Sequence, residues 1–212
     1  MTESGAELRP SDVVEAGYRN DAALIERATT SEDGAVRQAS VGALLRIGAL
    51  TTGRLATIAA DNDPSVRRRA AEVAPRLDNA AETEVMLVRL LGDVPEIAEM
   101  AAFALGEVGS ADGINLKPST IAAIEVIAST HDDPLCREAG VASLGALHTG
   151  LATILKACGD KATVRRRAVI ALAPFDGAEV ERALQTALTD RDWQVRQAAE
   201  DLIGPATSGP EG

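Results

Sequence analysis

The feature that most constrains this chain is a short pattern that returns along its length at intervals of about 30 residues. Each copy is marked by an apolar anchor residue that arginine usually follows. The anchors are Val36, Val66, Ile97, Cys136, Val164 and Val195. The longest interval, between the third and fourth copies, holds the stretch GSADGINLKPST, which is typical of a loop. A repeat of this length indicates a protein built from stacked units of two or three elements.

Each copy predicts a pair of helices joined by a turn. Four residues after the anchor stand small side chains, and eight residues after it stand mostly larger aliphatic ones, as in Ala168 and Leu172. Both spacings fall on one face of a helix. Ahead of each anchor lies a turn rich in Asp, Asn, Gly and Pro, which suits a helix start. A second apolar stretch precedes each turn, and neither helix can bury its apolar stripe alone.

We therefore predict an all-α fold, a right-handed α-solenoid of about six stacked helix-turn-helix repeats that spans residues 13–204. The composition agrees, since small aliphatic residues dominate and only 2% of residues are aromatic. Such residues let helices pack closely side by side. Residues 1–12 are expected to form a flexible tail and residues 205–212 a disordered one, because both are polar and rich in Gly, Pro or Ser.

The segments DNDPSVRRRAAEVA, HDDPLCREAGVASL and DRDWQVRQAAEDLI resemble HEAT repeats of the phycobilisome-lyase type, over about residues 20 to 204. The resemblance implies that the second helix of each pair lines a concave side. It also implies a ladder in which turn aspartates meet the arginines that follow the anchors. The ladder residues that it assigns are Arg37, Asp63, Arg67, Asp133, Arg137, Arg165, Asp192 and Arg196. The third copy has Val94 and Ala98 at these positions, so the ladder should be interrupted there.

Two arginine triplets, at 67–69 and 165–167, raise the question of what each arginine does. The middle arginine lies about 200° around the helix from the anchor and should point away from the core. We expect Arg68 and Arg166 on the concave wall, roughly 25–30 Å apart when helices stack at 8–10 Å. The predicted partner-binding residues are Arg68, Arg69, Glu72, Glu99, Phe103, Glu138, Arg166, Arg167 and Ile170. The alternative is a solvated face whose charges pair with one another, as Arg68 could with Glu72.

The chain offers little for catalysis. Its two histidines, His131 and His148, lack the His-Glu pairs of di-iron HEAT-repeat hydroxylases, so no metal site is predicted. Cys136 and Cys158 form no metal-binding motif and are expected to be free structural thiols. No catalytic residue and no cofactor is predicted. Trp193 is expected to cover the end of the array, with stacking on a ligand as the alternative.

These observations favour a non-catalytic scaffold that binds a protein or peptide partner on its concave face. The alternative is an accessory subunit or enzyme, related to lyases or oxidoreductases, that holds a tetrapyrrole-like or other anionic ligand with Arg68, Arg69, Arg166 and Arg167. A net charge of -11 argues against nucleic acid as a partner. No apolar run is long enough to span a membrane and no signal peptide is evident, so a cytoplasmic location is expected.

Overall fold

A computed structural model describes residues 7–111 and 114–204 of the chain. These described residues form thirteen α-helices and two short 3-10 helices, with no β-strand among them. The all-α prediction is therefore confirmed. The chain divides into two compact units, which we call unit 1 (Met1–Ala104) and unit 2 (Leu105–Gly212), and the boundary falls inside one helix, α7. In the described part, no helix combines the length and the apolar character that crossing a membrane requires.

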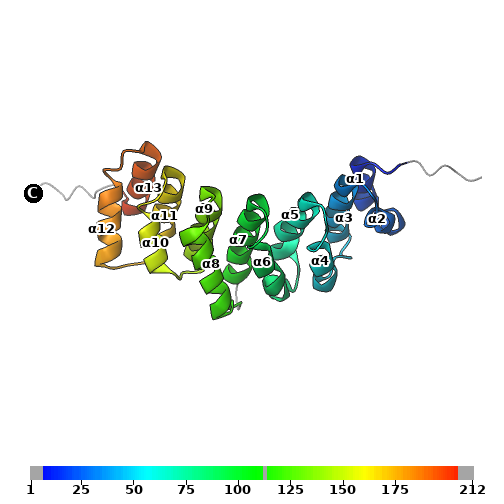
Figure 1. Cartoon of the computed structure of the whole chain (residues 1–212), viewed down its shortest axis with the longest axis horizontal. Helices are drawn as coiled ribbons and strands as arrows, with labels where there is room; N and C mark the ends of the chain where they lie inside the picture. The colour runs from blue at the N-terminus through cyan, green and yellow to red at the C-terminus, as the bar shows by residue number, and fades with distance from the viewer. Residues whose placement is uncertain (1–6, 112–113, 205–212) are drawn as a thin grey trace, which may run out of the picture. The chain divides into compact units, whose positions relative to one another are not determined.

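Unit 1 begins with a helix that precedes the first repeat (Figure 1). Its elements are α1 (Pro10–Arg19), α2 (Ala22–Ala28), α3 (Gly34–Arg46), α4 (Thr52–Ile58), α5 (Pro64–Val73), η1 (Ala74–Arg76), η2 (Ala80–Thr83), α6 (Glu84–Leu90) and the first part of α7 (Pro95–Ser110). The second helices of consecutive repeats are neighbours, since α3 packs against α5, and α1 packs against the other side of α3. Helix α1 starts at Pro10, inside the segment expected to be a tail, because proline suits the first helical position and Asp12 accepts a hydrogen bond from the Arg9 amide.

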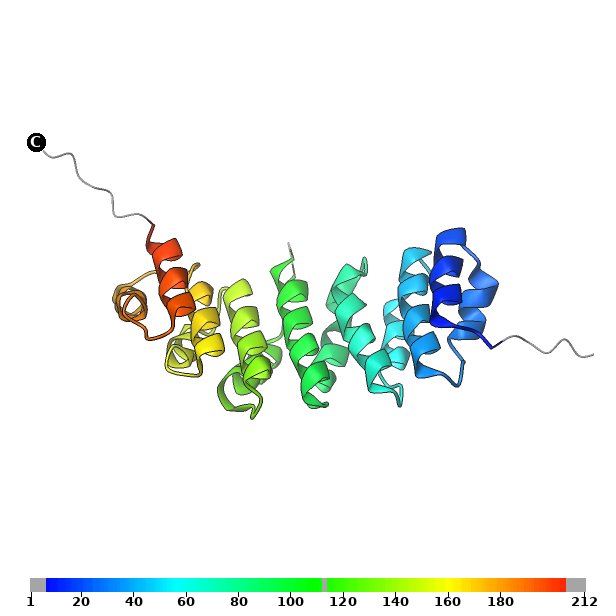
Figure 2. The ribbon, with the colours of Figure 1, turned by 90° about the horizontal axis from the view of Figure 1, so that it is seen from above.

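Unit 2 continues the same alternation of first and second helices. After the rest of α7 come α8 (Pro118–Thr130), α9 (Pro134–Ala146), α10 (Leu151–Ala157), α11 (Ala162–Ala171), α12 (Ala178–Ala187) and α13 (Trp193–Ile203). Helix α11 packs between α9 and α13, and Figure 2 shows these three second helices side by side, in yellow-green, yellow and red. The tail expected over 205–212 lies outside the described residues.

The repeat pattern marks the buried face of every second helix. All six anchors are at most 1% exposed, and the small residues four positions later, among them Ala70 and Ala168, are buried too. Eight positions after the anchor the side chains are also buried, except for Ile203 in the last helix, which is 43% exposed. Among the described residues no further helix follows α13, so no later helix of the described part covers Ile203.

Small residues set the distance between neighbouring second helices in unit 2. A Cβ atom added to Gly145 of α9 would lie 2.7 Å from the Cβ and 2.9 Å from the Cα of Ala171 in α11. The backbone of α11 would have to move to relieve that contact. Close approach of α9 and α11 therefore depends on the missing side chain.

We predict that Gly145→Ala lowers the free energy of unfolding by about 1–3 kcal/mol relative to Gly53→Ala. Gly53 lies in α4 with no neighbouring atom within 4 Å of an added Cβ. Both changes gain the higher helix propensity of alanine, so the difference between them reports overpacking alone. Urea unfolding followed by circular dichroism measures it, and equal stabilities would contradict the packing argument.

Candidate functional site

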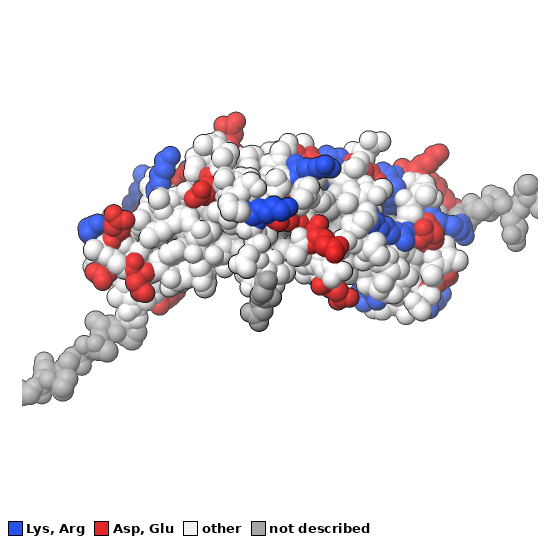
Figure 3. Space-filling model, turned by 90° about the horizontal axis from the view of Figure 1, so that it is seen from below, with Lys and Arg blue, Asp and Glu red and all other residues white. Residues whose placement is uncertain are grey.

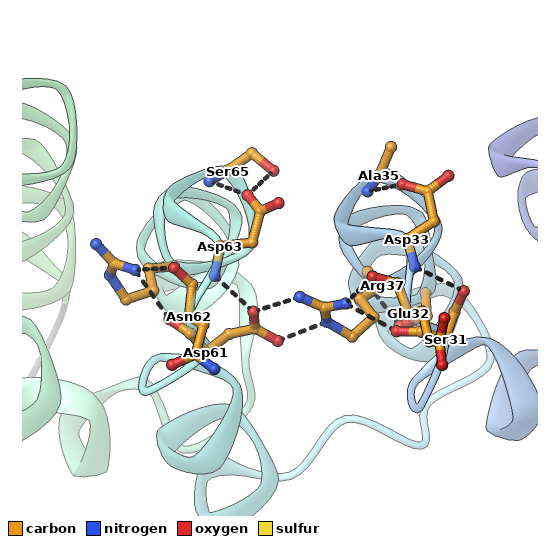
Figure 4. Close-up of polar contacts among 11 residues, drawn as sticks. Ser31, Glu32, Asp33, Ala35, Arg37, Asp61, Asn62, Asp63 and Ser65 are labelled. Atoms are coloured by element: carbon orange, nitrogen blue, oxygen red, sulfur yellow. Dashed lines mark hydrogen bonds and ion pairs between the residues drawn. The ribbon is translucent and has the colours of Figure 1, made fainter.

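In four repeats the arginine that follows the anchor ties its helix to the turn of the next repeat, as Arg37 does in Figure 4. Arg37 of α3 donates from Nε and Nη2 to both carboxylate oxygens of Asp61, each at 2.8 Å. Its Nη1 donates to the backbone carbonyls of Ser31 and Glu32 in its own turn. The same paired arrangement recurs at 2.7–2.8 Å in three further pairs: Arg67–Asp93, Arg137–Asp160 and Arg165–Asp190. Each pair lies within one unit.

The aspartates that meet these arginines are not the ones that the resemblance assigned. Asp63, Asp133 and Asp192 instead accept hydrogen bonds from backbone amides in the first turn of their own helices. An aspartate at an N-cap satisfies an amide that the helix leaves unpaired, so its carboxylate turns toward the helix. The arginine is left to an aspartate earlier in the turn, such as Asp61, whose Oδ1 also accepts from the Asp63 amide. An Asp four or five residues before the anchor recurs in four turns, at Asp61, Asp93, Asp160 and Asp190, and it was the signal that could have identified these partners.

Two positions depart from this arrangement. Ala98 of α7 carries no guanidinium, as the sequence showed, and Asp93 in the preceding turn accepts from Arg67. Arg196 of α13 keeps only the bond from Nη1 to the Asp190 carbonyl, at 2.7 Å, and has no carboxylate partner among the described residues. In α13, the last of the described second helices, the arginine thus keeps the bond to its own turn and lacks the pair with a carboxylate.

The paired aspartates are held in their charged form. Hydrogen bonds from the arginines lower the pKa of Asp61, Asp93, Asp160 and Asp190 below the ordinary 3.8, and burial opposes that shift. The same bonds raise the pKa of the four arginines. Each pair is therefore a charged, two-bonded contact that is largely shielded from water.

The second and third arginines of each triplet behave differently from the first. Arg68 and Arg166 are exposed and make no hydrogen bond or ion pair within the described residues. Arg69 donates to Glu72 at 2.7 Å, so the pair expected between Arg68 and Glu72 does not form. Arg167 reaches from α11 to Glu138 of α9 at 3.3 Å. In each triplet only the middle arginine has its charge and donors available.

The predicted partner-binding residues are divided between the two units. Unit 1 holds Arg68, Arg69, Glu72, Glu99 and Phe103, and unit 2 holds Glu138, Arg166, Arg167 and Ile170. Glu99 and Phe103 are both partly buried on α7. The four arginines suggested for an anionic ligand are split in the same way, and two of them already pair with glutamates.

Two pockets open on the second helices of unit 2. One, of about 320 Å³, is lined by residues of α11 and α13, among them Arg166, Ile170, Trp193 and Asp201. The other, of about 410 Å³, is lined by residues of α9, of α11 and of the segments that follow these helices. Ile170, 37% exposed, lines both. We call this surface the α9–α11–α13 face and define it by Glu138, Ala142, Arg166, Ile170, Trp193, Gln197 and Asp201.

Two interpretations of Trp193 followed from the sequence, covering the end of the array and stacking on a ligand. In the structure its side chain is 64% exposed and lines the pocket between α11 and α13. It stands at the first position of α13, directly after the N-cap Asp192, where a side chain projects beyond the buried face. Its exposure and its polar and apolar neighbours were not evident from the repeat pattern.

Neither the thiol of Cys158 nor the possible metal ligands show an arrangement suited to catalysis in the described residues. Burial raises the pKa of the Cys158 thiol to about 11, so it is protonated at neutral pH and a poor nucleophile. No group of three or more His, Cys, Asp or Glu side chains that could hold a metal gathers in the part of the chain that the structure describes. In the space-filling view of Figure 3, Lys and Arg (blue) and Asp and Glu (red) lie singly or in small groups of both signs.

Comparison with known proteins bears on the fold alone. No family model matches the chain, and no curated protein sequence matches it. The YibA protein of Escherichia coli superposes with a TM-score of 0.70 at 15% identity, over 92% of this chain and 74% of its own. A designed armadillo repeat protein in complex with the peptide (KR)4 gives a TM-score of 0.59 at 16% identity, over 85% of this chain and 97% of its own. An engineered protein gives a TM-score of 0.60 at 20% identity, over 95% of this chain and 65% of its own. This chain therefore has the fold of the armadillo- and HEAT-like helical repeat solenoids.

Proposed function

We propose that this protein is a non-catalytic scaffold that binds a segment of a partner protein on the exposed faces of its second helices. The observation that carries the proposal is the α9–α11–α13 face, where two pockets adjoin at the exposed Ile170 beside an unpaired arginine and an exposed tryptophan. Tryptophan and arginine are the residues most enriched where binding energy concentrates in protein interfaces. That a designed protein of the same fold is held in complex with a peptide supports the same conclusion.

The structure of the face suits binding without chemistry. Its helices are fixed to one another by the arginine–aspartate pairs and by close packing, so a partner meets a surface that is already ordered. A preformed surface loses little conformational entropy on binding, which favours affinity. In unit 1 the exposed Arg68 offers a second unpaired charge of the same kind.

The proposal is tested by affinity capture with a double variant, Arg68→Glu with Arg166→Glu. Proteins retained by the wild-type chain from a lysate of the source cells should be lost from this variant, since both free cations of the triplets are reversed. The matched control is Arg27→Glu with Arg182→Glu, which reverses two exposed arginines on the first helices α2 and α12. Quantitative mass spectrometry compares the three samples. The same retained proteins in all three would refute binding at the second helices.

Two finer inferences accompany this proposal. We infer that the repeats are HEAT repeats of the phycobilisome-lyase type, from the recurring Asp-x-Asp-Pro-x-Val-Arg pattern. We also infer that the protein acts in the reducing cytoplasm, in keeping with two cysteines that are both free.

A further inference from the structure

The pocket between α11 and α13 has an apolar floor that is open to solvent. Ile170, Ala198, Leu202 and the ring of Trp193 line it, and two of these side chains are exposed. Its volume of about 320 Å³ leaves room for a branched aliphatic side chain. Covering Ile170 and Trp193 with such a side chain removes apolar surface from water and favours binding.

The polar rim of the same pocket contains the guanidinium of Arg166, which lacks hydrogen-bond acceptors among the described residues. Arg166 carries five N–H donors, and none has an acceptor in the described residues. Asp201, the carboxylate that lines the same pocket, accepts from Gln197 Nε2 at 2.8 Å and makes no hydrogen bond or ion pair with Arg166, and Glu138 of α9 accepts from Arg167. A partner that covers this rim strips water from the guanidinium, which costs free energy unless the partner supplies an acceptor. The planar guanidinium matches the two oxygens of a carboxylate better than any other acceptor on a peptide.

We propose that the α11–α13 pocket recognises an aliphatic side chain of a partner segment together with an adjacent Asp or Glu whose carboxylate pairs with Arg166. The inference rests on the proposed function and names the chemistry of the partner. The aliphatic side chain sits against Ile170 and Trp193, and the carboxylate lies at the rim. The rival partner is a basic segment that uses Asp201, and it is made an outcome of the test below.

The probe is a random dodecapeptide display library selected on the full chain. The strongest selected peptide is then synthesised with a fluorescent label, and its affinity is measured by anisotropy in 150 mM NaCl. We expect the selected peptides to carry Asp or Glu within two positions of Leu, Ile or Val. Arg166→Glu should weaken binding by at least about tenfold, because attraction becomes repulsion. Arg182→Glu on α12, a reversal outside the pocket, should leave the affinity unchanged.

A charge exchange shows whether Arg166 contacts the peptide directly. A second peptide with Lys in place of the acidic residue should bind the wild-type chain weakly and should regain affinity for Arg166→Glu. Asp201→Asn should strengthen binding of the acidic peptide, since it removes a like charge from the lining of the pocket. A selected set that is basic, or a loss of binding on Asp201→Asn, overturns the inference in favour of the rival partner.

One further variant separates this inference from the function on which it rests. Ile170→Glu places a charge at the boundary of both pockets and should abolish peptide binding whatever the charge of the peptide. If Ile170→Glu abolishes binding but Arg166→Glu does not change it, the α9–α11–α13 face binds peptides and the acidic preference is wrong. If Ile170→Glu binds the selected peptides as the wild type does, both the proposed binding at the α9–α11–α13 face and the preference for an acidic peptide are wrong. Circular dichroism of each variant confirms that the helices are retained.

Discussion

Replacing Arg165 by alanine should lower the free energy of unfolding by about 1–3 kcal/mol, the usual cost of losing hydrogen bonds between charged groups. The Arg165 side chain is 8% exposed, and it donates to both oxygens of Asp190 and to the carbonyl of Asp160. The variant leaves a largely shielded carboxylate and a backbone carbonyl without their partner. Urea or thermal unfolding of the full chain measures the loss.

The control for this prediction is one residue away on the same helix. Arg166→Ala removes the same side chain from an exposed position that has no partner among the described residues, so it should change stability by no more than about 0.5 kcal/mol. Equal losses for the two variants would mean that the pairing of Arg165 with Asp190 contributes nothing beyond a surface arginine.

Acid should unfold this protein through its four paired aspartates. Their pKa values are lower in the folded chain than the ordinary 3.8, so the folded state favours the charged carboxylate. The stability that they contribute is therefore complete above the unfolded pKa and is lost as the pH falls through the lower folded values. The urea midpoint should be insensitive to these groups between pH 6 and pH 8 and should fall steeply below about pH 4.

Asp160→Asn tests whether the pairs cause this fall. Asparagine keeps an acceptor for Arg137 but cannot be titrated, so the variant should be less stable at pH 7 and should lose less stability between pH 5 and pH 3 than the wild type. Asp132→Asn is the control, since Asp132 is exposed and its side chain makes no hydrogen bond in the described residues. A wild-type midpoint that does not change down to pH 3 would show that the pairs are energetically neutral.

The fold could be predicted because it follows from the spacing of apolar, small and turn-forming residues along the sequence. An apolar anchor such as Val66, a small residue four positions later and an aspartate or proline in the turn each act through local geometry that recurs in every repeat. The extra helix α1 was not predicted, since it belongs to no repeat and the search for the pattern of about 30 residues did not reach it.

The candidate site was only partly predictable. The exposed position of Arg68 and Arg166 follows from helical geometry, but whether the neighbouring arginine is free depends on a residue of another helix. Arg167 finds Glu138 on α9, whereas Arg69 meets Gly42 on α3 and pairs with Glu72 of its own helix. Which aspartate of a turn meets the arginine depends likewise on where the helix begins. The aspartate at the N-cap bonds to its own helix, and an aspartate earlier in the turn accepts from the arginine.

Three consecutive arginines in α11 thus carry separate duties, one toward the next repeat, one toward water and one toward the previous helix. A substitution at the middle position changes the charge of the exposed surface, while both neighbouring arginines keep their partners. Protein design could therefore change the surface charge of one chosen repeat by replacing this single arginine, without altering the ion pairs made by its two neighbours.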